Sequence, residues 1–155
     1  MIYYNPTKIH FGKGGCLNEV DNILREYDIK RIFLITGRSF VKETKLLDKI
    51  FDALKNYDVI SYDKVSPSPK YKEVNDALTE AKNNYIEIII GVGGGSVLDT
   101  AKIVSVMFFS NDNLLDYVNK KTSVYKKIPF IAIPTTAGTG SEVTPFATFY
   151  YNKKK

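Results

Sequence analysis

The sequence EIIIGVGGGSVLDTAK, residues 87–102, decides the fold because it joins a predicted strand to a predicted helix through a short glycine turn. Residues 87–92 are mostly apolar and β-branched, which predicts a buried strand, and Ser96 opens a run with helical spacing. Three consecutive glycines, Gly93 to Gly95, stand between the two. Glycine lets the backbone approach a ligand without a Cβ clash, and the first turn of a helix offers free N–H groups to an anion. The stretch therefore fits either a phosphate-binding turn or a tight strand-to-helix connection.

The glycine run departs from two widespread nucleotide-binding motifs. It lacks the Gly-Lys-Ser/Thr ending of a P-loop, whose lysine reaches the terminal phosphates. It also follows a late strand, whereas the usual Rossmann fingerprint follows the first strand and has an acidic ribose partner about 20 residues further on. Ser96 and Asp99 have the S-x-x-D spacing of a capping box, so we expect Ser96 to fix the start of the helix. A dinucleotide could still bind here, but in a different topology.

The rest of the chain repeats this alternation of short apolar runs and longer amphipathic runs. Strands are predicted over residues 31–36, 58–62, 87–92 and 128–133, and helices over 40–56, 71–83, 96–108 and 113–118. Such alternation is typical of βαβ units, so the expected fold class is α/β, a Rossmann-like parallel sheet with helices on both faces. Residues 1–12 resemble a small β addition at one edge. Residues 148–151 resemble a strand that has just begun and has no visible partner. We therefore expect the chain to be a fragment of a larger protein or part of a protein assembled from separate pieces.

Composition excludes several classes of protein. The chain has 155 residues, 44% of them apolar and 25% charged, as expected for one globular domain. It has no apolar run of membrane-spanning length and no signal-peptide core in residues 1–15, so a cytoplasmic location without membrane contact is expected. The lone Cys16 agrees with a reducing compartment, and the single His10 cannot supply an imidazole-based metal site or, on a predicted strand, a catalytic triad. The net charge of +5 forms no basic stripe, so no nucleic-acid partner is expected.

Ligands of an open α/β sheet bind beyond the carboxyl ends of its strands, where a second loop is rich in polar groups. Residues 134–142, PTTAGTGSE, bring four hydroxyls and two glycines together after a buried strand. Hydroxyls and backbone amides suit a ribose, an amide or a phosphate. The same loop would also fit a capped turn into a short helix, with Ser141 or Thr139 as the N-cap.

Two further loops are open to interpretation. Gly37, Arg38 and Ser39 offer no acid to grip a ribose 2′-hydroxyl, and they would tolerate or attract a 2′-phosphate, or else form an ordinary surface turn. Residues 66–69, SPSP, form a rigid turn that could wall a pocket or simply connect two elements.

The combination of these motifs resembles the iron-containing (group III) alcohol dehydrogenase family. The motif G-G-G-S-x-x-D-x-A-K at residues 93–102 is followed by PTTAGTGSE at 134–142, with IHFGKG at 9–14 and the proline loop at 66–69 in the family's order. The resemblance covers residues 2–150. It implies an NAD(P)-dependent oxidoreductase that interconverts alcohols and aldehydes or ketones by hydride transfer, with residues 1–155 as its dinucleotide-binding domain.

The resemblance also implies which residues bind the cofactor. The glycine turn would hold the pyrophosphate, the threonines would lie near the nicotinamide, and Ser68, where relatives often have Asn, would lie beside the adenosine. Gly37 falls where NAD-preferring relatives carry Asp, so NADP is the expected cofactor and NAD the second choice. The expected cofactor-binding residues are Gly37, Arg38, Ser39, Ser68, Gly94, Gly95, Ser96, Asp99, Thr135, Thr136 and Thr139.

The family's metal is held by one Asp and three His of a helical C-terminal domain, which this chain lacks. His10 matches none of these positions, so no metal-binding or catalytic residue is expected, and iron or zinc would belong to the full-length protein. We expect an alcohol or aldehyde substrate in that full-length form, negligible activity of this chain alone, and a homodimer that covers exposed apolar surface. Two alternatives stay open. One is a non-catalytic nucleotide-binding or assembly module, and the other is a glycerol-phosphate or dehydroquinate-type branch of the same superfamily.

Overall fold

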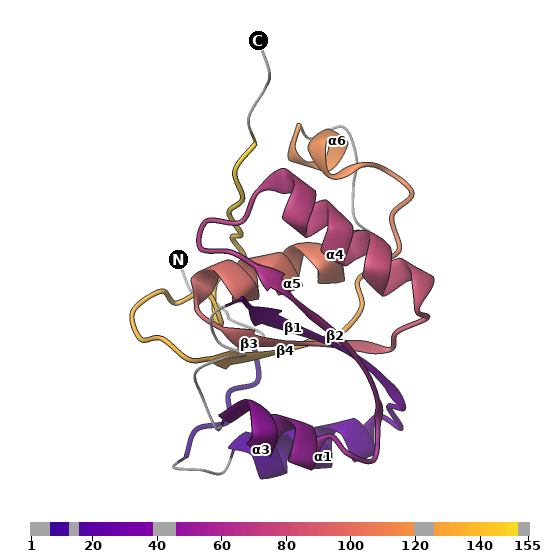
Figure 1. Cartoon of the computed structure of the whole chain (residues 1–155), viewed down its shortest axis with the longest axis vertical. Helices are drawn as coiled ribbons and strands as arrows, with labels where there is room; N and C mark the ends of the chain where they lie inside the picture. The colour runs from indigo at the N-terminus through magenta and orange to yellow at the C-terminus, as the bar shows by residue number, and fades with distance from the viewer. Residues whose placement is uncertain (1–6, 13–15, 39–45, 120–125, 152–155) are drawn as a thin grey trace, which may run out of the picture.

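A four-stranded parallel sheet forms the centre of the protein. The computed structural model describes residues 7–12, 16–38, 46–119 and 126–151. The sheet has the order β2-β1-β3-β4, and every neighbouring pair of strands is parallel (Figure 1). Its strands are β1 (Arg31–Gly37), β2 (Asp58–Val65), β3 (Ile88–Gly93) and β4 (Phe130–Pro134). The predicted α/β class is confirmed.

Helices cover both faces of this sheet, as Figure 1 shows. Helices α1 (Cys16–Glu26) and α3 (Leu46–Ala53) lie on one face, and α4 (Tyr71–Asn83) and α5 (Gly95–Met107) on the other; the short α6 (Leu114–Val118) follows α5. Side chains of β1 alternate between the two layers: Ile32 and Leu34 pack with α1 and α3, and Phe33 and Ile35 with α4 and α5. Because both faces are covered, β1 is buried almost throughout, which explains its continuous apolar sequence.

The strand order creates a switch point between β1 and β3. From β1 the chain continues to β2 on one side, then crosses back to β3 on the other side. The loops after β1 and β3 therefore leave in opposite directions, and ligands of open α/β sheets bind at such a point. This placement brings Gly37 close to the first turn of α5, where an added Cβ would lie 3.5 Å from Val97 Cγ2.

Several boundaries differ from those predicted. Helix α4 has the predicted bounds, but β2 extends to Val65 and α5 begins at Gly95. The prediction that Ser96 caps α5 is wrong, because Gly94 is the N-cap residue and no side chain caps the helix. Helix α1 was not predicted, although Val20 and Leu24 have helical spacing. Part of the helix expected over 40–56 lies outside the described residues.

The two chain ends also differ from expectation. Residues 7–12 form no strand, so the predicted N-terminal β addition is wrong for the described part, while residues 1–6 lie outside it. Tyr150 does have a partner: it forms a parallel bridge with Lys70, in which the Tyr150 N–H donates to the Pro69 carbonyl and the Tyr71 N–H donates to the Tyr150 carbonyl, each at 2.8 Å. This bridge ties the last described residues to the start of α4.

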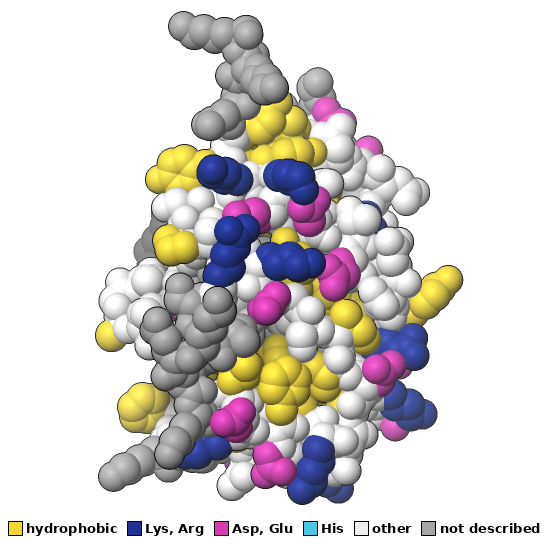
Figure 2. Space-filling model, viewed as in Figure 1, with side chains coloured by type: hydrophobic (Ala, Val, Ile, Leu, Met, Phe, Trp, Pro, Cys, Tyr) yellow, Lys and Arg dark blue, Asp and Glu magenta, His cyan; other side chains and the backbone are white. Residues whose placement is uncertain are grey.

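The surface drawn in Figure 2 carries lysines and arginines interspersed with acidic side chains. On α4, for example, Lys72 Nζ lies 2.6 Å from Asp76 Oδ2. Mixed charge is typical of a solvated face, and the absence of a nucleic-acid partner stays a prediction. Among the described residues, no helix has both the length and the hydropathy needed to cross a bilayer.

Candidate functional site

The first turn of α5 presents unpartnered backbone donors. The N–H groups of Val97 and Leu98 both donate to the Gly94 carbonyl, at 3.0 and 3.2 Å. Within the part of the chain that the structure describes, the N–H groups of Gly95 and Ser96 donate to no acceptor. These two donors, together with the positive end of the helix dipole, favour binding of an anion.

The glycines before α5 are needed for close packing as well as for open amides. A Cβ added at Gly93 would lie 2.6 Å from Val97 Cγ2, which no side chain tolerates without movement. A Cβ at Gly94 would lie 3.1 Å from Thr136 Oγ1, and one at Gly95 3.3 Å from Thr139 Cβ. The glycine turn therefore fits both interpretations of the sequence, because it packs tightly and leaves two amides free.

The loop after β4 lies against this turn, and together they line an open pocket of about 430 Å³. The Thr135 N–H donates to the Gly93 carbonyl at 3.0 Å, which fixes the start of the loop beside β3. Ser141 does not cap a helix, since residues 141–143 form only a turn. The cavity volume lies within the range of small-molecule sites. Its lining residues are Gly95, Ser96, Asp99, Thr139, Ser141, Thr144, Phe146 and Thr148.

Asp99 binds the loop that forms the far wall of the cavity. Its carboxylate accepts from Ser141 Oγ at 2.5 Å and from the Thr148 N–H at 2.9 Å. Lys102 Nζ lies 3.1 Å from Asp99 Oδ1 and donates to the carbonyls of Thr144, at 3.2 Å, and Phe146. The side chains of Asp99 and Lys102 are only 17% and 10% exposed. Both residues therefore anchor the 141–148 loop to α5, a role that sequence analysis did not identify.

Ser68 lies beside the first turn of α5. Its N–H donates to Ser96 Oγ at 3.1 Å, so the 66–69 turn contacts the first turn of α5. None of its residues lines the cavity, and its role as a wall of the site stays a prediction. Ser68 has a φ of 56°, a left-handed conformation that asparagine adopts more readily than serine. This geometry gives a structural reason for the asparagine expected at this position in relatives.

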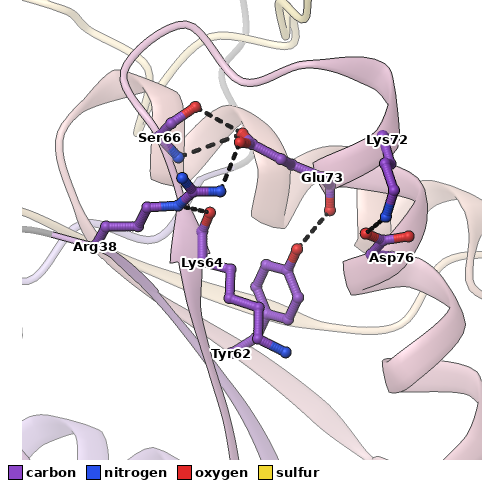
Figure 3. Close-up of polar contacts among 7 residues, drawn as sticks. All are labelled: Arg38, Tyr62, Lys64, Ser66, Lys72, Glu73 and Asp76. Carbon is purple, nitrogen blue, oxygen red and sulfur yellow. Dashed lines mark hydrogen bonds and ion pairs between the residues drawn. The ribbon is translucent and has the colours of Figure 1, made fainter.

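Arg38 points toward Lys64 on β2 and Glu73 on α4, as Figure 3 shows. Its Nε donates to the Lys64 carbonyl at 2.8 Å, and its Nη2 donates to Glu73 Oε1 at 2.9 Å. Gly37 stays close to the first turn of α5: a Cβ there would lie 3.5 Å from Val97 Cγ2, an ordinary contact. Ser39 lies outside the described residues.

Glu73 is the centre of this second cluster. Its other carboxylate oxygen accepts from Ser66 Oγ at 2.7 Å, and its backbone carbonyl accepts from the Tyr62 hydroxyl at 2.8 Å. Burial disfavours the charged carboxylate, but the hydrogen bonds from Ser66 and Lys70 and the charge of Arg38 outweigh burial and hold the pKa of Glu73 below its usual value. Burial raises the pKa of the Tyr62 phenol to about 12, so Tyr62 remains a donor at neutral pH.

The structure thus brings most of the predicted site residues to one edge of the sheet. Arg38 is nearby but engaged elsewhere, and Lys102 and Glu73 were missed as parts of the site. Residues 7–12, 16–38, 46–119 and 126–151 contain no group of three or more His, Cys, Asp or Glu side chains that could hold a metal ion. The donor set of a metal site is therefore not present in this part of the chain.

Comparison with known proteins identifies the family. The family model described as "Iron-containing alcohol dehydrogenase" matches residues 6–155. The chain belongs to the iron-containing alcohol dehydrogenase family. It is 36% identical over 144 residues to long-chain-alcohol dehydrogenase 1 of Geobacillus thermodenitrificans, covering 90% of this chain and 36% of that relative.

Solved structures of similar proteins agree with the fold. The NADH-dependent butanol dehydrogenase A of Thermotoga maritima superposes with a TM-score of 0.85 at 29% identity, over 92% of this chain and 36% of that one. The sulfoacetaldehyde reductase of Bifidobacterium kashiwanohense, solved in complex with NAD+, gives a TM-score of 0.84 at 31% identity, over 92% of this chain and 38% of that one. The chain therefore spans less than half the length of these relatives.

Proposed function

We propose that this chain is the NAD(P)-binding part of a metal-dependent alcohol dehydrogenase that interconverts alcohols and aldehydes or ketones by hydride transfer. One observation carries the proposal: among the described residues, the N–H groups of Gly95 and Ser96 at the start of α5, beside the switch point of the sheet, have no acceptor. The NAD+ complex of the related sulfoacetaldehyde reductase supports a dinucleotide as the ligand.

The proposed cofactor site assigns each loop a part of the dinucleotide. The diphosphate would accept from the Gly95 and Ser96 amides, and the hydroxyls of the 135–139 loop would lie toward the nicotinamide. The adenosine would lie toward Ser68 and Gly37. A bound nicotinamide supplies or accepts the hydride, and the residues of this chain hold and orient it. Asp99 acts on this site indirectly, because it fixes the 141–148 loop that lines the cavity.

We propose that the substrate oxygen is activated by the part of the full-length enzyme that this chain does not cover. Iron or zinc would polarise that oxygen, and the described residues offer no ligand cluster for such an ion. We therefore expect negligible turnover of butanol, glycols or aldehydes by this chain alone, with iron or zinc added. A rate comparable to that of full-length relatives would contradict this expectation.

The choice between NADP and NAD rests on two features of the loop after β1. Gly37 supplies no acid, which favours a 2′-phosphate, as predicted. Arg38 was the expected cation for that phosphate, yet its guanidinium is paired with Glu73. The cytoplasmic location, the homodimer and the two alternative functions stay predictions.

A pair of substitutions at Ser96 tests the proposed site. Ser96→Asp places a negative charge in the first turn of α5, which stabilises the helix but repels a diphosphate. Ser96→Asn has nearly the same shape and no charge. By calorimetry with NADH and NADPH, we expect the aspartate to weaken binding at least about tenfold and the asparagine to keep most of it. Equal affinities for the two variants, or no binding by the unmodified chain, would refute the proposal.

A further inference from the structure

Arg38 and Glu73 form an ion pair that engages the cation directly after Gly37. Arg38 Nη2 lies 2.9 Å from Glu73 Oε1, and Arg38 Nε donates to the Lys64 carbonyl at 2.8 Å. The Glu73 side chain is only 15% exposed, while that of Arg38 is 58% exposed. The carboxylate is thus the fixed member of the pair, and the guanidinium is held against it (Figure 3).

Three further groups hold Glu73 in place. Ser66 Oγ donates to Glu73 Oε2 at 2.7 Å, and the Ser66 N–H donates to the same oxygen at 3.4 Å. The Tyr62 hydroxyl donates to the Glu73 carbonyl at 2.8 Å and fixes the first turn of α4 against β2. These contacts keep the carboxylate charged and oriented, so Arg38 faces a permanent partner rather than a side chain that can swing away.

This ion pair lies next to the proposed nucleotide site. Arg38 follows directly after Gly37, where an added Cβ would contact Val97 in the first turn of α5. The 66–69 turn, which begins with the Ser66 that binds Glu73, also donates from Ser68 to Ser96 Oγ. The pair therefore adjoins two residues, Gly37 and Ser68, that contact the first turn of α5 and that the proposed function places toward the adenosine.

We propose that Glu73 is a specificity-determining residue that disfavours a 2′-phosphate on the adenosine ribose, so that the chain binds NADH more tightly than NADPH. The inference rests on the proposed cofactor site. Glu73 acts in two ways, since it occupies the guanidinium that would bind the phosphate and adds a negative charge to the same corner. A neutral 2′-hydroxyl meets neither penalty.

The test titrates NADH and NADPH separately into the whole chain and follows the fluorescence of the reduced nicotinamide. Glu73→Gln keeps the shape and an acceptor for Ser66 but frees Arg38, so NADPH affinity should rise about tenfold while NADH affinity stays within about twofold. Glu80→Gln is the matched control, because it removes the same charge from the same helix, where Glu80 pairs with Lys64 at 3.9 Å. It should leave both affinities unchanged.

Arg38→Gln separates the proposed role from a merely structural one. Added to Glu73→Gln, it should remove the gain in NADPH affinity. In the otherwise unmodified chain, it leaves the Glu73 charge without its cation, so NADPH binding should weaken while NADH binding stays unchanged. An unchanged ratio of NADPH to NADH affinity in Glu73→Gln, a gain that survives loss of Arg38, or a rise in NADPH affinity in Arg38→Gln alone would each overturn the inference. If the unmodified chain binds neither nucleotide, the proposed function itself fails, and the inference fails with it.

Discussion

Replacing Lys102 with methionine tests the anchor between α5 and the 141–148 loop. Methionine is nearly as long as lysine and packs well in a helix, so the change removes the ammonium group but little volume. Four acceptors lose this donor: Asp99 Oδ1 at 3.1 Å, the Thr144 carbonyl at 3.2 Å, Thr144 Oγ1 at 3.5 Å, and the Phe146 carbonyl. Asp99 would remain largely buried, with hydrogen bonds from Ser141 and Thr148 but no cation.

The expected loss of stability follows from this burial. Removing one partner of a buried ion pair costs about 3–5 kcal/mol, and the two remaining hydrogen bonds to Asp99 reduce this to about 2–4 kcal/mol. A domain of this size has about 5–15 kcal/mol of stability, so the variant should remain folded. Asp99→Asn should cost a similar amount, and the double variant less than the sum, with a coupling of at least about 1 kcal/mol.

Urea unfolding followed by far-UV circular dichroism measures these differences, since the chain has no tryptophan for a fluorescence signal. Lys72→Met is the matched control, because it removes the same group from an exposed pair with Asp76, where the loss should stay below about 0.5 kcal/mol. If Lys102→Met unfolds at the same urea concentration as the control, or if the Asp99 and Lys102 effects simply add, the anchor does not exist as described.

Three further predictions concern packing, cofactor choice and pH. Gly93→Ala should lose about 1–3 kcal/mol of unfolding free energy, because its Cβ would meet Val97 Cγ2 at 2.6 Å. Gly37→Ala has its nearest contact at 3.5 Å, so its unfolding free energy should be nearly unchanged. Equal losses in the two variants would contradict the packing argument. Gly37→Asp should shift the ratio of binding constants toward NADH, and an unchanged ratio would show that the ribose lies elsewhere. Backbone hydrogen bonds from Lys30 and Arg31 hold the pKa of Glu87 below 4.5, so its stabilisation is present above that pH and is lost as the pH falls through the folded-state pKa. Acid titrations of the chain and of Glu87→Gln should therefore converge below pH 4.5, and parallel curves would exclude this contribution.

Sequence patterns predicted the layers of the fold better than the contacts of the site. The buried strands are continuous apolar runs, and α4 follows a proline-rich turn, so both were visible in the sequence. Helix α1 was missed because acidic and basic residues separate its few apolar positions, although Val20 and Leu24 were a signal. The motif at 93–102 singled out the turn that opens α5, and the assignment of Asp99 to the cofactor stays a prediction. The contacts of Asp99 and Lys102 with the 141–148 loop were not predicted.

The other contacts that sequence patterns did not predict join side chains that lie far apart in the sequence. Arg38 and Glu73 are 35 residues apart, and nothing in either segment tells which way the guanidinium turns. Asp99 and Thr148 are 49 residues apart, and their contact depends on how the loop after β4 returns to α5. Such pairings are set by tertiary packing, which local spacing does not encode.

The proposed function depends most on one contact, between the free amides at the start of α5 and the diphosphate of a dinucleotide. Amide chemical shifts of the ¹⁵N-labelled chain, followed during a titration with NADH, test it most directly. We predict that the Gly95 and Ser96 signals move the furthest and saturate together with the Thr136 and Thr139 signals. If NADH binds saturably but the Gly95 and Ser96 signals do not move, while signals from other parts of the chain do, the account is contradicted.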